Sequence, residues 1–286
     1  MPRLLFKGGT SLSKCFGLIH RFSEDIDLGL EREDIGLGGD LDPLSKSSRK
    51  GYQRAVKAMT VATTEYVSHT LLPALERDFY AVLESNWGLR LEVNGSENDV
   101  MFEYPRALDA AVYGRDDYIA PVVRLELGAR SDHRSTTTAD IQPYADKFFA
   151  EEFERPTCRV VAQTLERTLL EKALIIHSAL SKGGFREHSS RHAYDLAMMH
   201  RAGTMDAVSR DLYTEVAHHK LVFGDDKPAS LAPTEGIRLV PLGEHRRRLE
   251  ADYRSMQPMF FTDPAPPNFD EVVADLSALE GALNLL

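Results

Sequence analysis

The sequence has little cysteine and no long hydrophobic run. Two cysteines among 286 residues, Cys15 and Cys158, cannot build the disulfide framework of a small secreted protein. The longest apolar stretches, such as residues 173–176, are much shorter than the roughly 20 residues of a membrane-spanning helix. The N-terminus lacks a basic segment followed by an apolar one, so no signal peptide is expected. We therefore expect a cytoplasmic protein with no membrane partner.

A net positive charge is also missing. The sequence has 34 Lys and Arg residues against 44 Asp and Glu residues, and its formal net charge is −10. This balance excludes a general nucleic-acid coat protein, and no DNA partner is expected, although a local basic patch can still bind nucleic acid. Zinc-ligand spacing is absent too, because the cysteines are far apart and His218 and His219 are adjacent.

The hydrophobic content of 43% is enough for a sizeable core, in one large domain or two lobes. Alternating and helical periodicities predict an α+β chain, with a mixed sheet in residues 1–142 and a mainly helical lobe in 143–286. The expected strands are 3–8, 25–30, 89–93, 100–104 and 118–127. The expected helices are 10–19, 51–86 with a break near Pro73, 160–180, 190–201 and 269–286. Residues 31–50 and 224–243 are predicted to be loops.

The stretch "FKGGTSLSKCFGLIHRFSEDIDLGL" (6–30) contains the most informative pattern. Gly8 and Gly9 separate a short strand from a helix, and a helix N-terminus preceded by glycines suits a phosphate group. Asp25 and Asp27 then share one face of the next strand. Two such carboxylates repel each other unless a cation lies between them, and oxygen ligands favour Mg²⁺. The stretch thus predicts a phosphate site beside a metal site, as phosphoryl or nucleotidyl transfer requires.

Each half of this pattern also has a plain structural explanation. An Asp-x-Asp pair is usually a solvated strand edge, and a glycine pair is usually a turn. The order strand, glycines, helix and carboxylate strand favours the functional interpretation. A Walker loop and the dinucleotide fingerprint G-x-G-x-x-G are both absent from the stretch, so nucleotide binding would use another scheme.

The segments "FKGGTSLSK" and "RFSEDIDL" resemble the first motif of DNA polymerase β-type nucleotidyltransferases. More closely, the chain is similar to the AbiEii/AbiGii toxin family, the nucleotidyltransferases of type IV and MenAT-like toxin–antitoxin systems. The resemblance covers most of the chain and includes "VVRLELGAR", "LERTLLEKALIIHSAL", "SSRHAYDLAMMH" and "IRLVPLG…RRRLEADYRSM". It implies a nucleotidyltransferase-like sheet flanked by helices, with a helical C-terminal lobe that completes the active site. Family members usually carry a helical segment before the first strand, so the true start lies upstream or this member is short.

The resemblance also implies roles for particular residues. Asp25 and Asp27 correspond to the metal-binding catalytic pair, and Glu126 would be the third metal ligand. The phosphate-binding positions are Gly8, Gly9, Thr10, Ser11, Lys14, Lys172 and Arg191. Asp195 corresponds to a catalytic-site acid that helps to deprotonate the acceptor hydroxyl. Lys172 corresponds to a catalytic residue that binds the nucleotide triphosphate.

Three of these positions keep a second interpretation. Glu126 is equally suited to pair with Arg124 on its own strand. Lys172 lies on an apolar stripe with Leu169, where a lysine can extend past its neighbours toward solvent. Arg191 and Asp195 are spaced i, i+4 and can form an intrahelical ion pair.

The function that these expectations describe is transfer of a nucleoside monophosphate from an NTP to a hydroxyl acceptor, with release of pyrophosphate. Mg²⁺ or Mn²⁺ is the expected cofactor, RNA (a tRNA 3′ end) the expected acceptor, and a cognate antitoxin encoded nearby the expected partner, in a phage-defence setting. Two alternatives stay open from the sequence: a non-catalytic nucleotide-binding regulator, and a nucleotidyltransferase that modifies a small molecule such as an antibiotic.

Overall fold

A computed structural model of the chain describes residues 3–23, 25–83, 90–94, 98–103, 122–152, 157–260 and 265–286. The chain divides into two compact units. The first unit consists of Met1–Ser11 and Ser23–Ala162, and the second of Leu12–Phe22 and Gln163–Leu286. The sequence predicted a boundary after residue 142, whereas the two units divide after Ala162. The short segment Leu12–Phe22 belongs to the helical unit, so a single boundary along the chain does not separate the two units.

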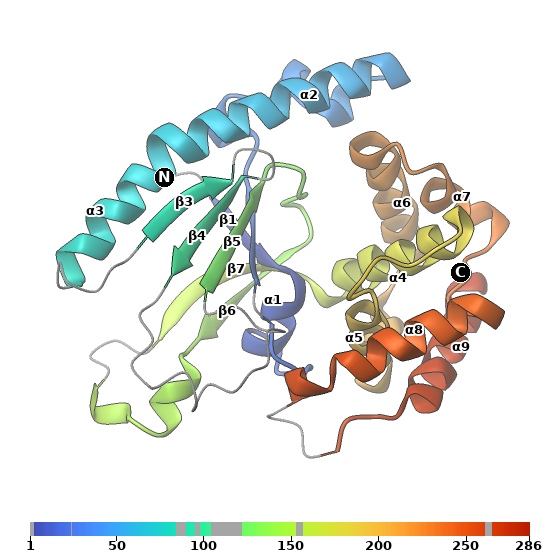
Figure 1. Cartoon of the computed structure of the whole chain (residues 1–286). Coiled ribbons are helices and arrows are strands. Elements are labelled where there is room, and N and C mark those ends of the chain that lie inside the picture. The colour runs from blue at the N-terminus through green and yellow to red at the C-terminus, as the bar shows by residue number, and fades with distance from the viewer. Residues whose placement is uncertain are drawn as a thin grey trace. The chain divides into compact units, whose positions relative to one another are not determined.

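The first unit is built on a seven-stranded mixed sheet with strand order β3-β4-β5-β2-β1-β7-β6 (Figure 1). Its strands are β1 (Leu4–Lys7), β2 (Asp25–Leu30), β3 (Arg90–Asn94), β4 (Asp99–Glu103), β5 (Val122–Gly128), β6 (Thr136–Ile141) and β7 (Cys158–Gln163). β2 pairs antiparallel with β1 and parallel with β5, and β4 pairs antiparallel with both β3 and β5. The predicted α+β class with a mixed sheet is confirmed. The predicted ends at residues 89, 104 and 118–121 lie outside the described residues.

A long, interrupted helix accompanies this sheet. It comprises α2 (Arg49–Tyr66), a π-helical turn (Val67–Leu71) and α3 (Leu72–Val82), and Figure 1 shows it running alongside the sheet from α2 to α3. Residues at successive spacings of four are buried and form one stripe along it: Ala55, Met59, Thr63, Val67 and Leu71. The predicted break near Pro73 is confirmed. Proline has no N–H to donate, so the regular hydrogen-bond ladder is interrupted where the π turn ends.

The helix after the glycine pair is shorter than the sequence predicted. α1 extends from Gly8 to Lys14, so the expected continuation to Ile19 is wrong. Gly17 adopts a left-handed φ of +63°, and the Leu18 N–H donates to the Leu12 carbonyl at 3.0 Å. A residue other than glycine would be strained at this φ, so Gly17 permits the chain to turn out of the helix early.

The second unit is helical. It contains α4 (Leu165–Lys182), α5 (Ser190–Arg201), α6 (Arg210–Gly224), α7 (Lys227–Glu235), α8 (Gly243–Ser255) and α9 (Phe269–Asn284). α4 packs against α5, α6 and α7, while α5 also contacts α8 and α9. Fully buried side chains at this centre include Leu169, Leu174, Ile176, Tyr194 and Leu196. No helix in the described part of the chain is long and apolar enough to cross a membrane.

Two predictions for the second half are wrong. The chain after Gln142 is not helical throughout, because β7, which lies between β1 and β6 in the sheet, precedes α4. The predicted loop at 224–243 contains α7, which has Pro228 in its first turn and Pro233 inside. A proline in the first turn costs no hydrogen bond, since the N–H groups there have no partner in the helix, so Pro228 is compatible with a helix start.

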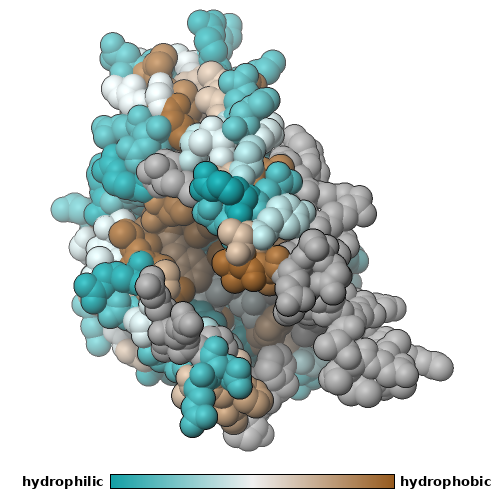
Figure 2. All heavy atoms as spheres, turned by 90° about the vertical axis from the view of Figure 1, so that its left-hand side faces the viewer, coloured by the Kyte–Doolittle hydropathy of each residue, from teal (hydrophilic) through white to brown (hydrophobic). Residues whose placement is uncertain are grey.

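Figure 2 turns the side of Figure 1 that carries α3 and β3 toward the viewer. Hydrophobic residues gather near the middle of this face, and hydrophilic residues predominate above and below them. Exposed large hydrophobic side chains of the first unit include Tyr80, Val82, Phe148 and Phe149. Isolated exposed apolar side chains are normal on a globular surface, so they indicate no site by themselves.

Candidate active site

The carboxylates of β2 lie in a row of charged residues that crosses the sheet. Asp27 is directly opposite Lys7 on β1 and Glu126 on β5, and Glu126 is directly opposite Asp99 on β4. Residues directly opposite on paired strands place their side chains on the same face. The strand pairing therefore brings Asp27, Glu126 and Asp99 side by side. Asp25 lies on the same face two residues earlier, opposite Arg124.

This arrangement makes Glu126 difficult to ionise. Burial, followed by the negative charges of Asp27, Asp25 and Asp99, raises the pKa of Glu126 to about 7, and Arg124 opposes the rise. Two nearby cations, Lys7 and Arg124, make only long contacts with these carboxylates. Lys7 Nζ lies 3.9 Å from Asp27 Oδ1, and Arg124 lies 3.8 Å from Asp25 and 4.0 Å from Glu126. Glu126 thus satisfies both interpretations from the sequence, since it is next to Asp27 and within reach of Arg124.

The turn between β1 and α1 is fitted closely to β2. Gly8 has a left-handed φ of +74°, and a β-carbon at this position would lie 1.8 Å from Oδ2 of Asp27. The Thr10 hydroxyl donates to the Asp25 carbonyl, and the Ser11 hydroxyl donates to the Gly8 carbonyl at 2.9 Å. Ser11 is fully buried, so its hydroxyl shapes the turn. These contacts place Gly8 and Thr10 next to the two aspartates.

The donor set of this row suits a divalent cation. Among the described residues, no three His, Cys, Asp or Glu side chains converge as a preformed metal centre. The chemistry still fits, because Asp25, Asp27 and Glu126 supply the carboxylate oxygens that Mg²⁺ and Mn²⁺ prefer. Burial and then the neighbouring carboxylates raise the pKa of Glu126, and a bound cation would oppose this rise.

A second polar cluster is buried inside the helical unit. Asp195 on α5 is 0% exposed, and Arg21 binds both of its oxygens, with Nε and Nη2 each 2.8 Å from one oxygen. Lys172 on α4 lies 2.9 Å from Oδ2 of the same carboxylate. Arg21 Nη1 also donates to the Phe22 carbonyl at 2.9 Å, which holds the guanidinium plane in place. Arg21, Asp195 and Lys172 therefore form one ion cluster, which we call the Asp195 cluster.

The electrostatics of the Asp195 cluster decide what its members can do. Burial alone would raise the pKa of Asp195, but the positive charges of Arg21 and Lys172 outweigh burial and hold this pKa far below its usual range. A carboxylate held in this way is a poor proton acceptor at neutral pH. Asp195 is thus better suited to anchor Lys172 than to deprotonate a hydroxyl. The neighbouring His192 is neutral, because burial and the Lys172 cation lower its pKa to about 3.

Two cations, Arg21 and Lys172, contact the Asp195 carboxylate. Lys172 is 7% exposed. An ammonium group has three N–H donors, so a lysine anchored through one of them can still bind an anion. Arg191, the other predicted phosphate ligand on α5, points its Nε toward the His188 carbonyl at 3.4 Å.

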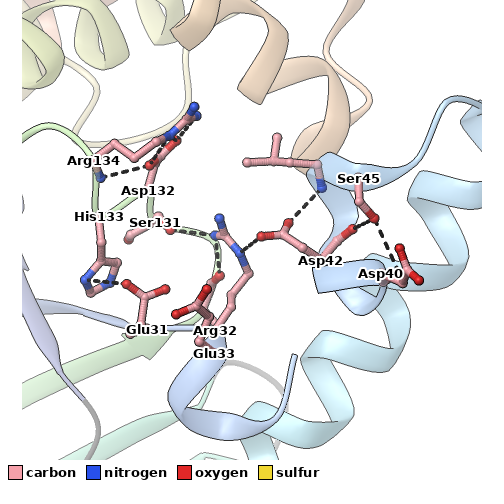
Figure 3. A network of polar contacts seen from close by, with 12 residues as sticks. Glu31, Arg32, Glu33, Asp40, Asp42, Ser45, Ser131, Asp132, His133 and Arg134 are labelled. Carbon is pink, nitrogen blue, oxygen red and sulfur yellow. Dashed lines mark hydrogen bonds and ion pairs between the residues drawn. The ribbon is translucent and has the colours of Figure 1, made fainter. Parts of the chain in front are cut away.

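A network centred on Arg32 holds the two carboxylate-bearing strands in register (Figure 3). Arg32 follows β2, and its guanidinium donates to the carbonyls of Ala129 at 3.2 Å and Ser131 at 2.7 Å, which follow β5. Its Nε also donates to Asp42 Oδ2 at 2.9 Å. Figure 3 shows Arg32 between Asp42 and the segment after β5. The network therefore ties together the ends of β2 and β5, the strands that present Asp27 and Glu126.

The family model described as the nucleotidyl transferase AbiEii toxin of a type IV toxin–antitoxin system matches residues 1–275. The chain belongs to the AbiEii family. The AbiEii chain is accordingly a nucleotidyltransferase, as its sequence predicted, and family membership implies an NTP substrate and a cognate antitoxin. Comparison with curated proteins finds no match.

Among solved structures, the AbiEii chain is similar to MenT4, a nucleotidyltransferase toxin from Mycobacterium tuberculosis. The identity is 17% and the TM-score 0.40, over 100% of this chain and 85% of MenT4.

Two contacts in these clusters were not predicted from the sequence: that of Asp99 with Glu126 and that of Arg21 with Asp195. Asp99 was predicted just outside a strand and has no local signal, because only the β4–β5 register brings it to Glu126. Arg21 lies inside the most informative stretch, but its partner is 174 residues away. A spacing pattern cannot identify a pair that is so distant in the chain.

Proposed function

We propose that the AbiEii chain transfers a nucleoside monophosphate from an NTP to a hydroxyl of RNA, at the 3′ end of tRNA, and that it does so with Mg²⁺ or Mn²⁺. The observation that carries this proposal is the carboxylate row on the sheet, where Asp27 lies between Lys7 and Glu126 with Asp25 on the same face. Nucleotidyl transfer depends on positioning and charge neutralisation, and these residues are suited to both.

Asp25 and Asp27 would hold the metal, with Glu126 as a further ligand. When bound, such an ion neutralises charge that develops on the transferred phosphoryl group. The chain's own contribution is to orient the ligands. The Thr10 hydroxyl fixes the Asp25 backbone, and the absence of a side chain at Gly8 leaves room for the Asp27 carboxylate. Burial and then the acidic neighbours raise the pKa of Glu126, and this pKa would fall once a cation is present.

The proposed phosphate ligands are the backbone of Gly8, Gly9 and Thr10 together with Lys172, Lys14 and Arg191. For Lys172, support comes from its fixed position beside Asp195, whose carboxylate also binds Arg21. A cation that is fixed by an anchor pays little conformational entropy when it binds a phosphate oxygen. Because Asp195 is a poor base, the acceptor hydroxyl would lose its proton to solvent or to a group on the sheet rather than to Asp195.

An RNA acceptor is proposed from the family resemblance and from local charge. Arg130 is exposed and Arg134 has a side chain that is 63% exposed, and both follow β5 directly. Exposed arginines suit a nucleic-acid backbone even though the whole chain is acidic.

The test incubates the purified chain with Mg²⁺, each labelled NTP in turn, and total RNA. We expect label in RNA from the wild type, and none from Asp25→Asn or Asp27→Asn. Asp140→Asn is a matched control, because Asp140 lies on β6 and forms an exposed ion pair with Arg159. Transfer that persists in Asp25→Asn and Asp27→Asn would overturn the assignment of the carboxylate row. Label in a small hydroxylated compound and not in RNA would favour the antibiotic-type alternative.

A further inference from the structure

We infer that Lys7 is a further phosphate ligand of the nucleotidyltransferase: it is the counter-ion of Asp27 until a divalent cation binds there, and it then turns to a phosphate of the NTP. This inference rests on the proposed function, because it takes Asp27 as a metal ligand. It adds to the carboxylate row a cation that exchanges one anionic partner for another.

The position of Lys7 in the sheet is the first support. Lys7 is the last residue of β1, and it lies directly opposite Asp27 on the antiparallel strand β2. Residues that are directly opposite on paired strands place their side chains on the same face. The Lys7 side chain is therefore on the carboxylate face of the sheet. It also begins one residue before Gly8, where the proposed phosphate-binding turn starts.

The two oxygens of Asp27 give the second support. A β-carbon at Gly8 would lie 1.8 Å from Oδ2, so this oxygen is packed against the backbone of the turn. The other oxygen, Oδ1, lies 3.9 Å from Lys7 Nζ. The carboxylate thus has the turn on one side and the Lys7 ammonium on the other. A flexible lysine stem that starts beside this turn is suited to follow a phosphate group bound there.

The contact between Lys7 and Asp27 is loose enough to be exchanged, which is the third support. A distance of 3.9 Å is longer than the roughly 2.7–3.2 Å of a hydrogen bond, so Asp27 does not hold the N–H donors of the ammonium group. The Lys7 side chain is 30% exposed, whereas that of Lys172 is 8% exposed and lies 2.9 Å from Asp195. Lys172 is therefore a fixed cation, and Lys7 is a movable one.

Electrostatics explain why the exchange would accompany metal binding. Lys7 and a divalent cation carry charge of the same sign, so they compete for the Asp27 carboxylate. Once the cation has Asp27 as a ligand, the Lys7 ammonium loses its partner and is repelled from the row. A lysine binds phosphate as a point charge, and the NTP supplies phosphate oxygens at the adjacent turn.

Two titrations of Lys7→Met test this role without measuring turnover. Methionine keeps most of the apolar stem and removes the charge. In the absence of nucleotide, Mn²⁺ should bind up to about fivefold more tightly than to the wild type, because a partly exposed counter-ion no longer competes. With saturating Mg²⁺, a non-hydrolysable NTP analogue should bind about tenfold more weakly, because one charge-assisted contact is lost. The two affinities thus change in opposite directions, whereas misfolding would weaken both.

Two further variants serve as controls. Lys57→Met removes a lysine that is exposed on α2, and it should change neither affinity. Lys7→Arg keeps the positive charge, so both affinities should stay within a few-fold of the wild type. Thermal unfolding and circular dichroism establish that each variant is folded before it is titrated.

A fourth variant, Asp27→Asn, separates failure of this inference from failure of the proposed function. If Asp27→Asn binds Mn²⁺ as tightly as the wild type, the proposed metal site fails, and the exchange at Asp27 fails with it. If Asp27→Asn loses Mn²⁺ but folded Lys7→Met binds the NTP analogue normally, the inference about Lys7 is overturned while the proposed function stands. Weaker binding of both Mn²⁺ and the analogue by folded Lys7→Met would also overturn it, because a counter-ion must compete with the metal.

Discussion

Gly8 lies directly against the carboxylate of Asp27. A β-carbon at Gly8 would lie 1.8 Å from Asp27 Oδ2 and 2.6 Å from its Cγ, and the backbone at Gly8 has a left-handed φ of +74°. The strand that carries Asp27 therefore contacts the turn that begins α1 at Gly8, and only glycine leaves enough room for this contact. Steric packing against Asp27 thus explains why this position holds glycine, whether or not a ligand binds.

We expect Gly8→Ala to abolish nucleotidyl transfer, because the added methyl group would displace the Asp27 carboxylate. The left-handed φ would add strain of about 1 kcal/mol. Gly36→Ala is a matched control, since Gly36 has a φ of +78° with nothing within 4 Å of the added carbon. Both variants should lose similar backbone stability in thermal unfolding, but Gly36→Ala should keep its activity. Equal activity in the two variants would contradict the role assigned to this contact.

Stability should depend on pH through Glu126. Its pKa is raised from 4.5 to about 7, so between these values the folded chain holds a proton that the unfolded chain has released. The free energy of unfolding should therefore decrease as pH rises from about 4.5 to 7, and this loss should be complete above pH 7. Glu126→Gln should flatten the profile and be more stable than the wild type at pH 8 without metal.

Urea unfolding in EDTA at pH values from 4.5 to 8 measures this dependence. The control is Glu235→Gln, because Glu235 is exposed at the end of α7 and should leave the profile unchanged. Adding Mg²⁺ should stabilise the wild type more at pH 8 than at pH 5, since a cation offsets carboxylates that are ionised. A wild-type profile that rises between pH 5 and 7, with no effect of Glu126→Gln, would argue against crowding of these carboxylates.

Lys172→Met should impair NTP use more than it impairs folding. Methionine keeps most of the apolar stem, and Arg21 still neutralises Asp195, so we expect a stability loss of about 1–3 kcal/mol. The KM for NTP should increase by about tenfold or more, because one charge-assisted contact is lost. The matched control is Lys182→Met, since Lys182 is on the same helix but 53% exposed and paired with Asp226. Steady-state kinetics that show equal KM values for both variants would refute the assignment.

Arg32→Met should destabilise the first unit. Arg32 is 7% exposed in its side chain, and its loss leaves Asp42 and the Ala129 and Ser131 carbonyls without this donor. We expect a cost of about 2–4 kcal/mol, as for other buried charged hydrogen-bond networks. Arg159→Met is the control, because Arg159 is 76% exposed and solvent screens its ion pair with Asp140, so its loss should hardly change stability. Chemical denaturation of both variants decides whether the Arg32 network is structural support.

Local sequence patterns predicted several elements of both units well. β2 was predicted at its observed residues, 25–30, because side chains alternate between the faces of a strand and the pattern of Asp25 and Asp27 is visible within six residues. α9 was predicted to begin at Phe269, where Asn268 forms a capping box with Glu271. The stripe containing Lys172 was predicted to be buried, and Lys172 is 7% exposed. All of these depend on neighbours within a few residues.

The wrong predictions arose where apolar spacing along the chain fitted a helix but another feature decided the element. The helix from Thr10 was expected to reach Ile19 on apolar spacing alone, but Gly17 ends it, and Ile19 is buried all the same. β7 was taken as part of a helix, since Val160 and Val161 in isolation fit either element and pairing with the sheet decided between them. Local apolar spacing shows that a residue will be buried, but it does not show in which element.

By itself, the sequence determined the chemical groups of this protein and their local order: a glycine turn, a short helix, two aspartates on one strand face, and a buried lysine on a helical stripe. Family membership followed from the same residues. The tertiary structure alone decided which groups meet, because Asp27 reaches Glu126 through the parallel register of β2 and β5, and Asp195 meets Arg21 from 174 residues away. Such pairs depend on chain folding over long separations, for which no spacing rule exists, and they determine which charged groups surround Lys172 and Glu126.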